Sequence, residues 1–359
     1  MPPPGRGWPD VLASLLAGAD LSLPDATWAM GQIMTGEATP VQVAGFLVAL
    51  RAKGETVSEL AGIAETMLAH SRPIEVPGPA LDVVGTGGDQ AHTVNISTMS
   101  AVTAAAAGVT VVKHGNRAAS SSAGTADVLE ALGVRLDLEP EAVAEVARRC
   151  GITFCFAQVF HPSVRHAAVP RRELGIPTVF NVLGPLTNPA RPAYSAVGVA
   201  DPRMAPLVAG VFAERGMDAA VFRGDDGLDE VTVSTTSSVW WVRGGTVARF
   251  VVDPAGLGLA YHGLDALRGG QPADNAAVVR QVFAGRPGPV RDAVLLNTGI
   301  ALAVTAPGDP GDQGQFEVAL REGMDRAARA LDGGAVTAKL DQWIQVSHEL
   351  ARKLGGQPS

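Results

Sequence analysis

Three loops of the chain carry residues suited to binding a phosphorylated sugar. The first, at residues 85–89, reads Gly-Thr-Gly-Gly-Asp and leads to a helix start at residues 95–98, Asn-Ile-Ser-Thr. Glycines let backbone N–H groups approach an anion closely, and a helix N-terminus favours negative charge. The spacing fits neither the dinucleotide fingerprint, whose third glycine would fall at Gln90, nor a P-loop. Simple helix capping is the alternative role for residues 95–98, so this loop alone is a weak signal.

The second loop is basic and rich in hydroxyl groups. Residues 113–117 read Lys-His-Gly-Asn-Arg, and residues 118–122 read Ala-Ala-Ser-Ser-Ser. Two cations, a glycine and three hydroxyls suit a polyphosphate. For His114 a structural role is the alternative, and no second His or Cys has the spacing of a zinc ligand. We therefore expect this loop to bind phosphate rather than zinc.

The third loop is acidic, with four carboxylates between residues 225 and 230. Such runs are usually solvated surface, but paired carboxylates also hold magnesium. If this turn faces the first two loops, Asp229 and Glu230 are placed to bind a magnesium ion that in turn holds a pyrophosphate. Without that juxtaposition, the surface interpretation is the better one.

A fourth segment, residues 161–175, is basic and is predicted to be helical on both sides of Pro170. Arg171 or Arg172 has the planar fork that clamps a carboxylate bidentately. The alternative is a pair of surface arginines balanced by Glu173.

The elements that position these loops form two patterns. Residues 1–76 read as helices, with capping signals at residues 39–42 and 56–59, and predict a small helical domain. Beyond residue 80, short apolar runs at 81–84, 109–112 and 219–222 alternate with Ala-rich helical stretches. This alternation predicts an α/β domain with a mostly parallel central sheet flanked by helices. Because parallel strands direct their C-terminal ends to one edge of the sheet, the loops are expected to converge there.

Composition excludes several classes of function. The 359 residues carry a net charge of -8, with no run of basic residues that would attract nucleic acid or an anionic membrane. Neither a signal peptide nor a membrane-spanning apolar stretch is apparent, so we expect a cytoplasmic protein. The two cysteines, Cys150 and Cys155, are expected to be buried and reduced.

The set of motifs resembles the anthranilate phosphoribosyltransferase family of tryptophan biosynthesis. The motifs are 85–89, 95–98, 113–117, Asn-Val-Leu-Gly-Pro-Leu-Thr-Asn-Pro at 181–189, and Asp-Gly-Leu-Asp-Glu at 226–230. The resemblance, which runs from the helical start to about residue 350, implies transfer of phosphoribosyl from 5-phosphoribosyl 1-pyrophosphate to the amine of anthranilate, with release of pyrophosphate. It also implies Mg²⁺, as two ions, and a homodimer formed through the helical domain. The expected boundaries are 1–76 for the helical domain and 77–359 for the α/β domain, with a helical segment near 161–190 packing on the former.

The resemblance also implies roles for individual residues. The implied phosphoribosyl pyrophosphate contacts are Gly85, Gly88, Asp89, Thr93, Asn95, Ile96, Ser97, Thr98, Lys113, His114, Gly115, Asn116, Arg117, Ala118, Ala119, Ser120, Ser121 and Thr125. The implied anthranilate contacts are Gly85, His114, Asn116, Arg171 and Pro185. The implied magnesium ligands are Ser97, Asp229 and Glu230. Lys113 and Arg171 are candidates for charge stabilisation and positioning, and no general base is assigned.

The chain departs from the family pattern at three positions. Thr125 replaces a usual Ser, Gln158 stands where a Pro usually follows Phe-Ala, and Arg223 replaces a common His before the acidic turn. A transferase acting on a substituted anthranilate is therefore one alternative function. A nucleoside phosphorylase-like enzyme and a nucleic-acid-binding relative of the family are the others.

Overall fold

The computed structural model describes residues 7–117 and 123–355, with backbone only for the last three. The chain begins with a bundle of four helices: α1 (Trp8–Leu16), α2 (Leu23–Thr35), α3 (Pro40–Lys53) and α4 (Val57–Ala69). Capping boxes begin α3 and α4, where the Thr39 and Thr56 hydroxyls accept hydrogen bonds from the N–H groups of Gln42 and Glu59. The predicted helical start is thus present, and local capping explains two of its helix boundaries.

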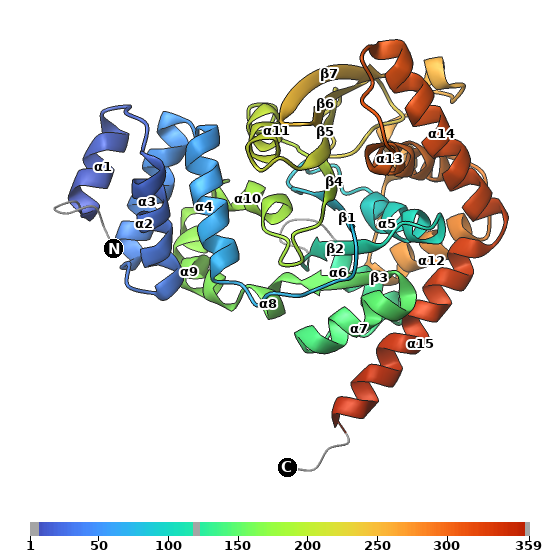
Figure 1. The fold of residues 1–359 in the computed structure, drawn as a ribbon, viewed down its shortest axis with the longest axis horizontal. Helices are drawn as coiled ribbons and strands as arrows, with labels where there is room; N and C mark the ends of the chain where they lie inside the picture. The colour runs from blue at the N-terminus through green and yellow to red at the C-terminus, as the bar shows by residue number, and fades with distance from the viewer. Residues whose placement is uncertain (1–6, 118–122, 356–359) are drawn as a thin grey trace.

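A seven-stranded sheet forms the centre of the larger part of the molecule (Figure 1). Its order is β3-β2-β1-β4-β5-β6-β7; the first five strands are parallel, and β6 and β7 are added antiparallel. The strands are β1 (Leu81–Gly85), β2 (Val111–Gly115), β3 (Ile152–Phe156), β4 (Tyr194–Gly198), β5 (Asp218–Gly224), β6 (Ser237–Arg243) and β7 (Thr246–Val252). The prediction of a mostly parallel sheet is confirmed.

Helices cover both faces of this sheet. The remaining helices are α5 (Ile96–Ala106), α6 (Thr125–Leu132), α7 (Pro140–Cys150), α8 (Ala157–Phe160), α9 (Arg165–Leu174), α10 (Phe180–Leu183), α11 (Met204–Glu214), α12 (Pro272–Phe283), α13 (Pro289–Thr305), α14 (Gln313–Asp332) and α15 (Ala335–Gly355). Side chains alternate along the strands: Val83 belongs to the core shared with α5 and α13, whereas Val84 belongs to the core shared with α11 and the helical bundle. The sheet therefore separates two apolar cores.

The observed elements refine the predicted ones. Strand β2 begins at Val111, two residues later than predicted, and α9 runs continuously through Pro170. The helices α9 and α10 share the apolar core of the first four helices. Cys150 and Cys155 are buried free thiols, as expected.

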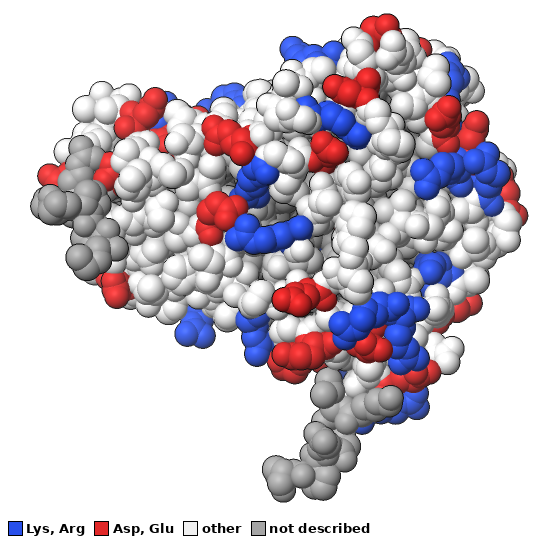
Figure 2. Space-filling model, in the orientation of Figure 1, with Lys and Arg blue, Asp and Glu red and all other residues white. Residues whose placement is uncertain are grey.

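No helix of the described residues has the length and apolar character needed to cross a membrane. Figure 2 shows Lys, Arg, Asp and Glu interspersed over the face in view, without a broad area of one sign.

Candidate active site

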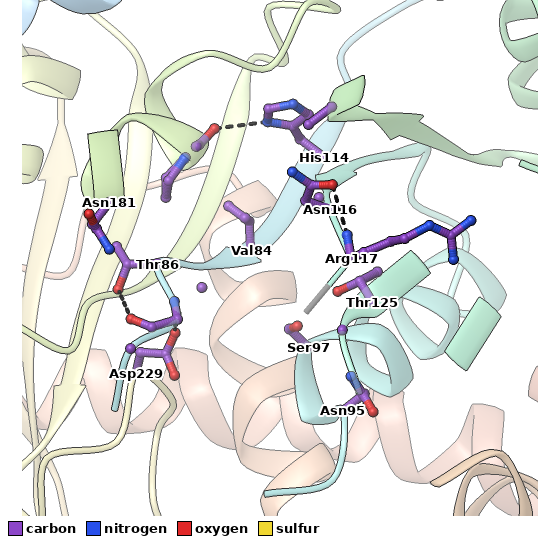
Figure 3. Close-up of a pocket in the computed structure, with 18 of the residues that line it drawn as sticks. Val84, Thr86, Asn95, Ser97, His114, Asn116, Arg117, Thr125, Asn181 and Asp229 are labelled. Atoms are coloured by element: carbon purple, nitrogen blue, oxygen red, sulfur yellow. Dashed lines mark hydrogen bonds between the residues drawn. The ribbon is translucent and has the colours of Figure 1, made fainter. Parts of the chain in front are cut away.

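A cavity of about 570 Å³ lies at the carboxyl ends of the parallel strands, next to α4 and α9. The predicted site residues that line it are Gly85, Gly88, Asp89, Thr93, Asn95, Ile96, Ser97, Lys113, His114, Gly115, Asn116, Arg117, Thr125, Arg171, Pro185, Asp229 and Glu230. Thr98 does not line it and is buried. Ala118, Ala119, Ser120 and Ser121 lie outside the described residues. The three loops expected to converge therefore do so, as Figure 3 shows for ten of the lining residues.

The acidic loop after β5 reaches the glycine loop after β1. The Gly87 N–H donates to Asp229 Oδ2 at 2.7 Å, and the Ser97 N–H donates to Glu230 Oε1 at 3.2 Å. Burial, together with the nearby Asp89, raises the pKa of Asp229 to about 7. Burial and the neighbouring Asp229 raise the pKa of Glu230 well above its usual range. Two desolvated carboxylates at one point favour a bound cation.

Two glycines make this approach possible. A Cβ atom on Gly85 would overlap the Asp229 carboxylate, and a Cβ atom on Gly198 would overlap the Asp229 main-chain carbonyl. Gly85 and Gly198 are the last residues of the neighbouring strands β1 and β4. Glycine at both positions therefore lets the acidic loop lie directly over the strand ends.

The four acids of this loop divide into two pairs. Asp226 accepts hydrogen bonds from the Thr232 hydroxyl at 2.6 Å and from the Leu228 N–H at 3.1 Å. Asp225 accepts from the Thr236 hydroxyl at 2.5 Å. These two carboxylates shape the loop, while the other two face the cavity. The surface interpretation is therefore wrong for Asp229 and Glu230, which are 9% and 8% exposed.

Lys113 lies beneath the cavity, 1% exposed, and donates to the Ser97 hydroxyl at 3.2 Å and to the Val83 carbonyl. Burial lowers its pKa, and the charges of Asp82 and Glu230 oppose that effect. Asp82 is fully buried, and burial raises its pKa to about 6. This buried group of opposite charges joins the ends of β1 and β2 to the acidic loop.

The segment 181–189 supports the same strands from the side of the helical bundle. The Asn188 amide donates to Asp82 Oδ2 at 2.8 Å and to the Val112 carbonyl at 2.7 Å. His114 Nδ1 is 2.9 Å from the Gly184 carbonyl, and His161 Nε2 is 2.8 Å from the Thr187 carbonyl. Because a carbonyl only accepts, these ring nitrogens are protonated and the opposite nitrogens are bare acceptors. Burial lowers the pKa of His114 to about 3 and that of His161 to about 4, so both imidazoles are neutral.

Two residues expected to contact phosphate, Asn95 and Arg117, do not have the hydrogen bonds that their sequence positions predict. Asn95 precedes α5, but its side chain makes no capping hydrogen bond to that helix. The Arg117 guanidinium is held by Glu130 at 2.6 and 2.8 Å and by Asp127 at 3.0 Å. In Figure 3 it extends away from the centre of the cavity. The charge of Arg117 is therefore already paired with the carboxylates of Glu130 and Asp127. Helix capping, the alternative role for Asn95, does not explain the position of that side chain.

One face of α9 and the turn before it closes the other side of the cavity. Val164, Ala168 and Arg171 line the cavity at spacings of four and three residues, whereas the exposed Arg172 does not. The Arg171 guanidinium lies 4.8 Å from the centre of the Phe180 ring. Neither the ion pairs nor the side-chain hydrogen bonds of the described residues include the Arg171 guanidinium. A half-buried, unpaired cation stacked on an aromatic ring suits a planar carboxylate.

Sequence reasoning assigned no site role to a second set of lining residues, although some of them lie in the motifs at 85–89, 161–175 and 181–189. They are Met67, Val84, Thr86, Gly87, Gln90, His92, Val94, Ala123, Gly124, Ala157, Gln158, His161, Pro162, Val164, Arg165, Ala168, Phe180, Asn181 and Gly184. Most are apolar or small, and no local pattern separates such residues from core positions. The basic character of residues 161–175 was the sequence signal available, and it pointed to α9, which lines the cavity.

The residues at the acidic loop fit a magnesium ion. Asp229, Glu230 and the Ser97 hydroxyl are hard oxygen donors, and the two carboxylates are buried without an ion-pair partner among the described residues. Within that part of the chain, no group of three or more His, Cys, Asp or Glu side chains forms a complete metal cage. Magnesium is commonly held by one or two carboxylates together with substrate phosphates, so a complete cage is not required.

Family models match both parts of the chain. Residues 9–71 match the helical bundle domain of a glycosyl transferase family, and residues 77–337 match the α/β domain of that family. The fold and the site thus define the class: a glycosyl transferase built from a helical bundle and an α/β domain.

Individual relatives narrow the class. An anthranilate phosphoribosyltransferase of Nocardioides sp. is 61% identical over 338 residues, covering 94% of this chain and 98% of its own. The anthranilate phosphoribosyltransferase of Thermus thermophilus, known from a crystal structure, is 40% identical in sequence. The two structures match with a TM-score of 0.87, over 94% of this chain and 99% of the Thermus chain. The Saccharomyces cerevisiae anthranilate phosphoribosyltransferase in complex with PRPP and Mg is 28% identical and matches with a TM-score of 0.86, over 96% of this chain and 98% of the yeast chain. The yeast protein has also been solved in complex with 4-fluoroanthranilate. This chain belongs to the anthranilate phosphoribosyltransferase family, which confirms the resemblance noted in the sequence.

Proposed function

We propose that the protein transfers the phosphoribosyl group of phosphoribosyl pyrophosphate to the amine of anthranilate and releases pyrophosphate. One observation carries this proposal: the unpaired Arg171 guanidinium, stacked on Phe180, lines the same cavity as the buried carboxylates and the glycine loop. This arrangement supports one cavity that holds both a cation for a benzoate carboxylate and a site for a phosphorylated sugar. The yeast relative solved with PRPP and Mg, and with 4-fluoroanthranilate, supports both halves.

The donor would bind along the loops after β1 and β2. Backbone N–H groups of residues 85–89 and the N-terminus of α5 offer donors for phosphate oxygens. Lys113 contributes positive charge from beneath, held by its contacts to Val83 and Ser97. The Arg117 guanidinium contributes less, because Glu130 and Asp127 already neutralise it.

Asp229, Glu230 and the Ser97 hydroxyl would hold Mg²⁺, as two ions. When bound, the metal supplies positive charge that stabilises the departing pyrophosphate. The raised pKa values of the two carboxyl groups mean that their charged forms are unfavourable without a cation and are stabilised when one binds. Metal and donor are therefore expected to bind together.

Arg171 would fix the anthranilate carboxylate and so aim the amine at the ribose carbon. Positioning is the main requirement, because the aryl amine is already neutral near pH 7 and the transition state resembles an oxocarbenium ion. The bare acceptor nitrogens of His114 and His161 have no partner among the described residues. With pKa values of about 3 and 4, these imidazoles are weak bases, so we assign no general base.

The decisive assay uses the fluorescence of anthranilate. Mixing the protein with anthranilate, Mg²⁺ and phosphoribosyl pyrophosphate should abolish the fluorescence, and omitting the protein, the metal or the donor should preserve it. Persistence of the signal in the complete mixture would overturn the proposal. Ring-substituted anthranilates in the same assay test whether Gln158, at the cavity wall, widens the acceptor range.

We also propose a cytoplasmic homodimer formed through the helical bundle of residues 1–76. Exposed apolar side chains on this side of the molecule support the proposal. Val41 on α3 is 81% exposed, and Leu16 on α1 is 79% exposed. Sedimentation analysis should give twice the chain mass, and Val41→Asp should reduce it to the monomer.

A further inference from the structure

Two buried asparagines connect the C-terminal third of the chain to the site. Among the described residues, the cavity lining ends at Glu230, so the helices α12 to α15 provide none of it. Nevertheless Asn275 on α12 and Asn297 on α13, 2% and 1% exposed, bond to residues of the cavity loops. Burying an amide is unfavourable unless all its polar atoms are bonded, so such residues indicate a specific role.

Asn275 determines how the Asn95 side chain is turned. Its Oδ1 accepts from the Gly270 N–H at 2.8 Å, and its Nδ2 donates to Asn95 Oδ1 at 2.9 Å. Asn95 Nδ2 in turn donates to the Ala123 carbonyl at 3.2 Å. Because Gly270 N–H can only donate and the Ala123 carbonyl can only accept, the orientation of both amides is determined.

The backbone before α12 holds the same loop. The Val94 N–H donates to the Leu267 carbonyl at 2.9 Å, and the Gly269 N–H donates to the His92 carbonyl at 2.8 Å. Gln90 and His92 have φ values of 58° and 52°, a left-handed conformation that is unfavourable for residues other than glycine. The segment 267–275 therefore stabilises a strained stretch of the loop that connects β1 to α5.

Asn297 acts on the other loop. Its Oδ1 accepts from the Val231 N–H at 2.9 Å, and its Nδ2 donates to the Val231 carbonyl at 2.8 Å and to the Ala293 carbonyl at 2.9 Å. A single side chain thus satisfies both backbone groups of Val231, as a neighbouring strand would. Since Val231 directly follows Glu230, this contact determines where the carboxylate pair lies.

We infer that Asn275 and Asn297 are positioning residues with separate effects, the first on the sugar-phosphate donor through Asn95 and the second on the divalent cation through the Asp229–Glu230 loop. The inference rests on the proposed function for the identity of donor and metal. Neither asparagine lines the cavity. Each acts through one loop, so each is expected to change one binding constant.

Replacing each asparagine by its isostere tests this separation. A carboxylate at position 275 cannot donate to Asn95 Oδ1, so Asn275→Asp should raise KM for phosphoribosyl pyrophosphate about tenfold, with the Mg²⁺ requirement at saturating donor unchanged. Asn297→Asp loses both donations from Nδ2 and should raise the Mg²⁺ concentration for half-maximal rate about tenfold. At saturating Mg²⁺, its KM for the donor should equal that of the wild type. KM for anthranilate should stay constant in both.

The two variants are matched controls for each other, because each exchanges a buried amide for a carboxylate, on two helices that follow each other in the chain. If both variants change the same constant, or lower kcat alone, the inference is overturned. Where an Asp variant does not fold, the smaller Asn275→Ser and Asn297→Ser carry the same test, and failure of these to fold would show a purely structural role and overturn it too. If the wild-type protein itself does not consume anthranilate, the proposed function fails, whereas normal constants in the variants reject only the positioning roles.

Discussion

The buried histidine pair should make a destabilising contribution in acid, and His161→Gln should remove a defined part of that contribution. His161 is 4% exposed, and its ring centre lies 5.1 Å from that of His114. Burial lowers the pKa of His161 from 6.5 to about 4. The unfolded chain therefore binds a proton on this residue at pH values where the folded chain does not, and stability is lost as pH falls from 6.5 toward 4.

The size of the effect follows from the linkage between proton binding and folding. At pH 5 the contribution lost by His161, relative to neutral pH, is about 2 kcal/mol. His114, with its pKa lowered to about 3, loses a similar amount. Asp82 acts in the opposite direction. Because its pKa is raised to about 6, the folded protein takes up a proton on Asp82 in acid, and this adds about 1 kcal/mol to the free energy of unfolding at pH 5. Asp229 and Glu230, whose pKa values burial also raises, act in the same direction as Asp82, so the histidine contribution is isolated by comparing the wild type with the His161 variant.

The measurement is the free energy of unfolding by denaturant at the two pH values. Glutamine keeps a donor where His161 Nε2 meets the Thr187 carbonyl and takes up no proton. On going from neutral pH to pH 5, the free energy of unfolding of the variant should therefore change by about 2 kcal/mol less unfavourably than that of the wild type. His348→Gln is the matched control: this exposed imidazole on α15 also bonds a carbonyl, that of Gly133, at 2.9 Å. An equal change in the free energy of unfolding between the two pH values in the wild type and the His161 variant would refute the reasoning.

The remaining predictions concern the two ends of the cavity. Arg171→Ala should raise KM for anthranilate about 10- to 150-fold, the equivalent of about 1.5–3 kcal/mol for a charged hydrogen bond, with KM for the donor little changed. The exposed neighbour provides the control: Arg172→Ala should leave both constants near wild type, and equal effects of the two changes in steady-state assays would contradict the assignment. Asp229→Asn combined with Glu230→Gln should abolish magnesium-dependent turnover. The melting temperature without metal should be unchanged or higher, because neutral amides replace two buried carboxyl groups whose charged forms are unfavourable there. Near-normal activity would exclude the metal role.

Local interactions made much of this protein predictable from its sequence. Thr39 and Thr56 begin helices through contacts three residues away, and the alternation of apolar runs with helical stretches implies a parallel sheet. The sheet in turn implies that the loops after β1, β2 and β5 meet at one edge. The resemblance of five motifs to one enzyme family, confirmed by relatives of high identity, added the chemistry that residue types alone left open.

Tertiary structure decided which members of each local group face the cavity. Asp229 reaches Gly87 across 142 residues of sequence, whereas Asp226, three residues before it, bonds within its own loop. Arg117 carries the charge expected of a phosphate ligand, yet Glu130 pairs with it. Such choices depend on desolvation and on contacts between distant segments, and neither leaves a periodic signal in sequence. The sequence by itself therefore determined the elements and the kind of chemistry, and only the packed structure assigned that chemistry to particular side chains.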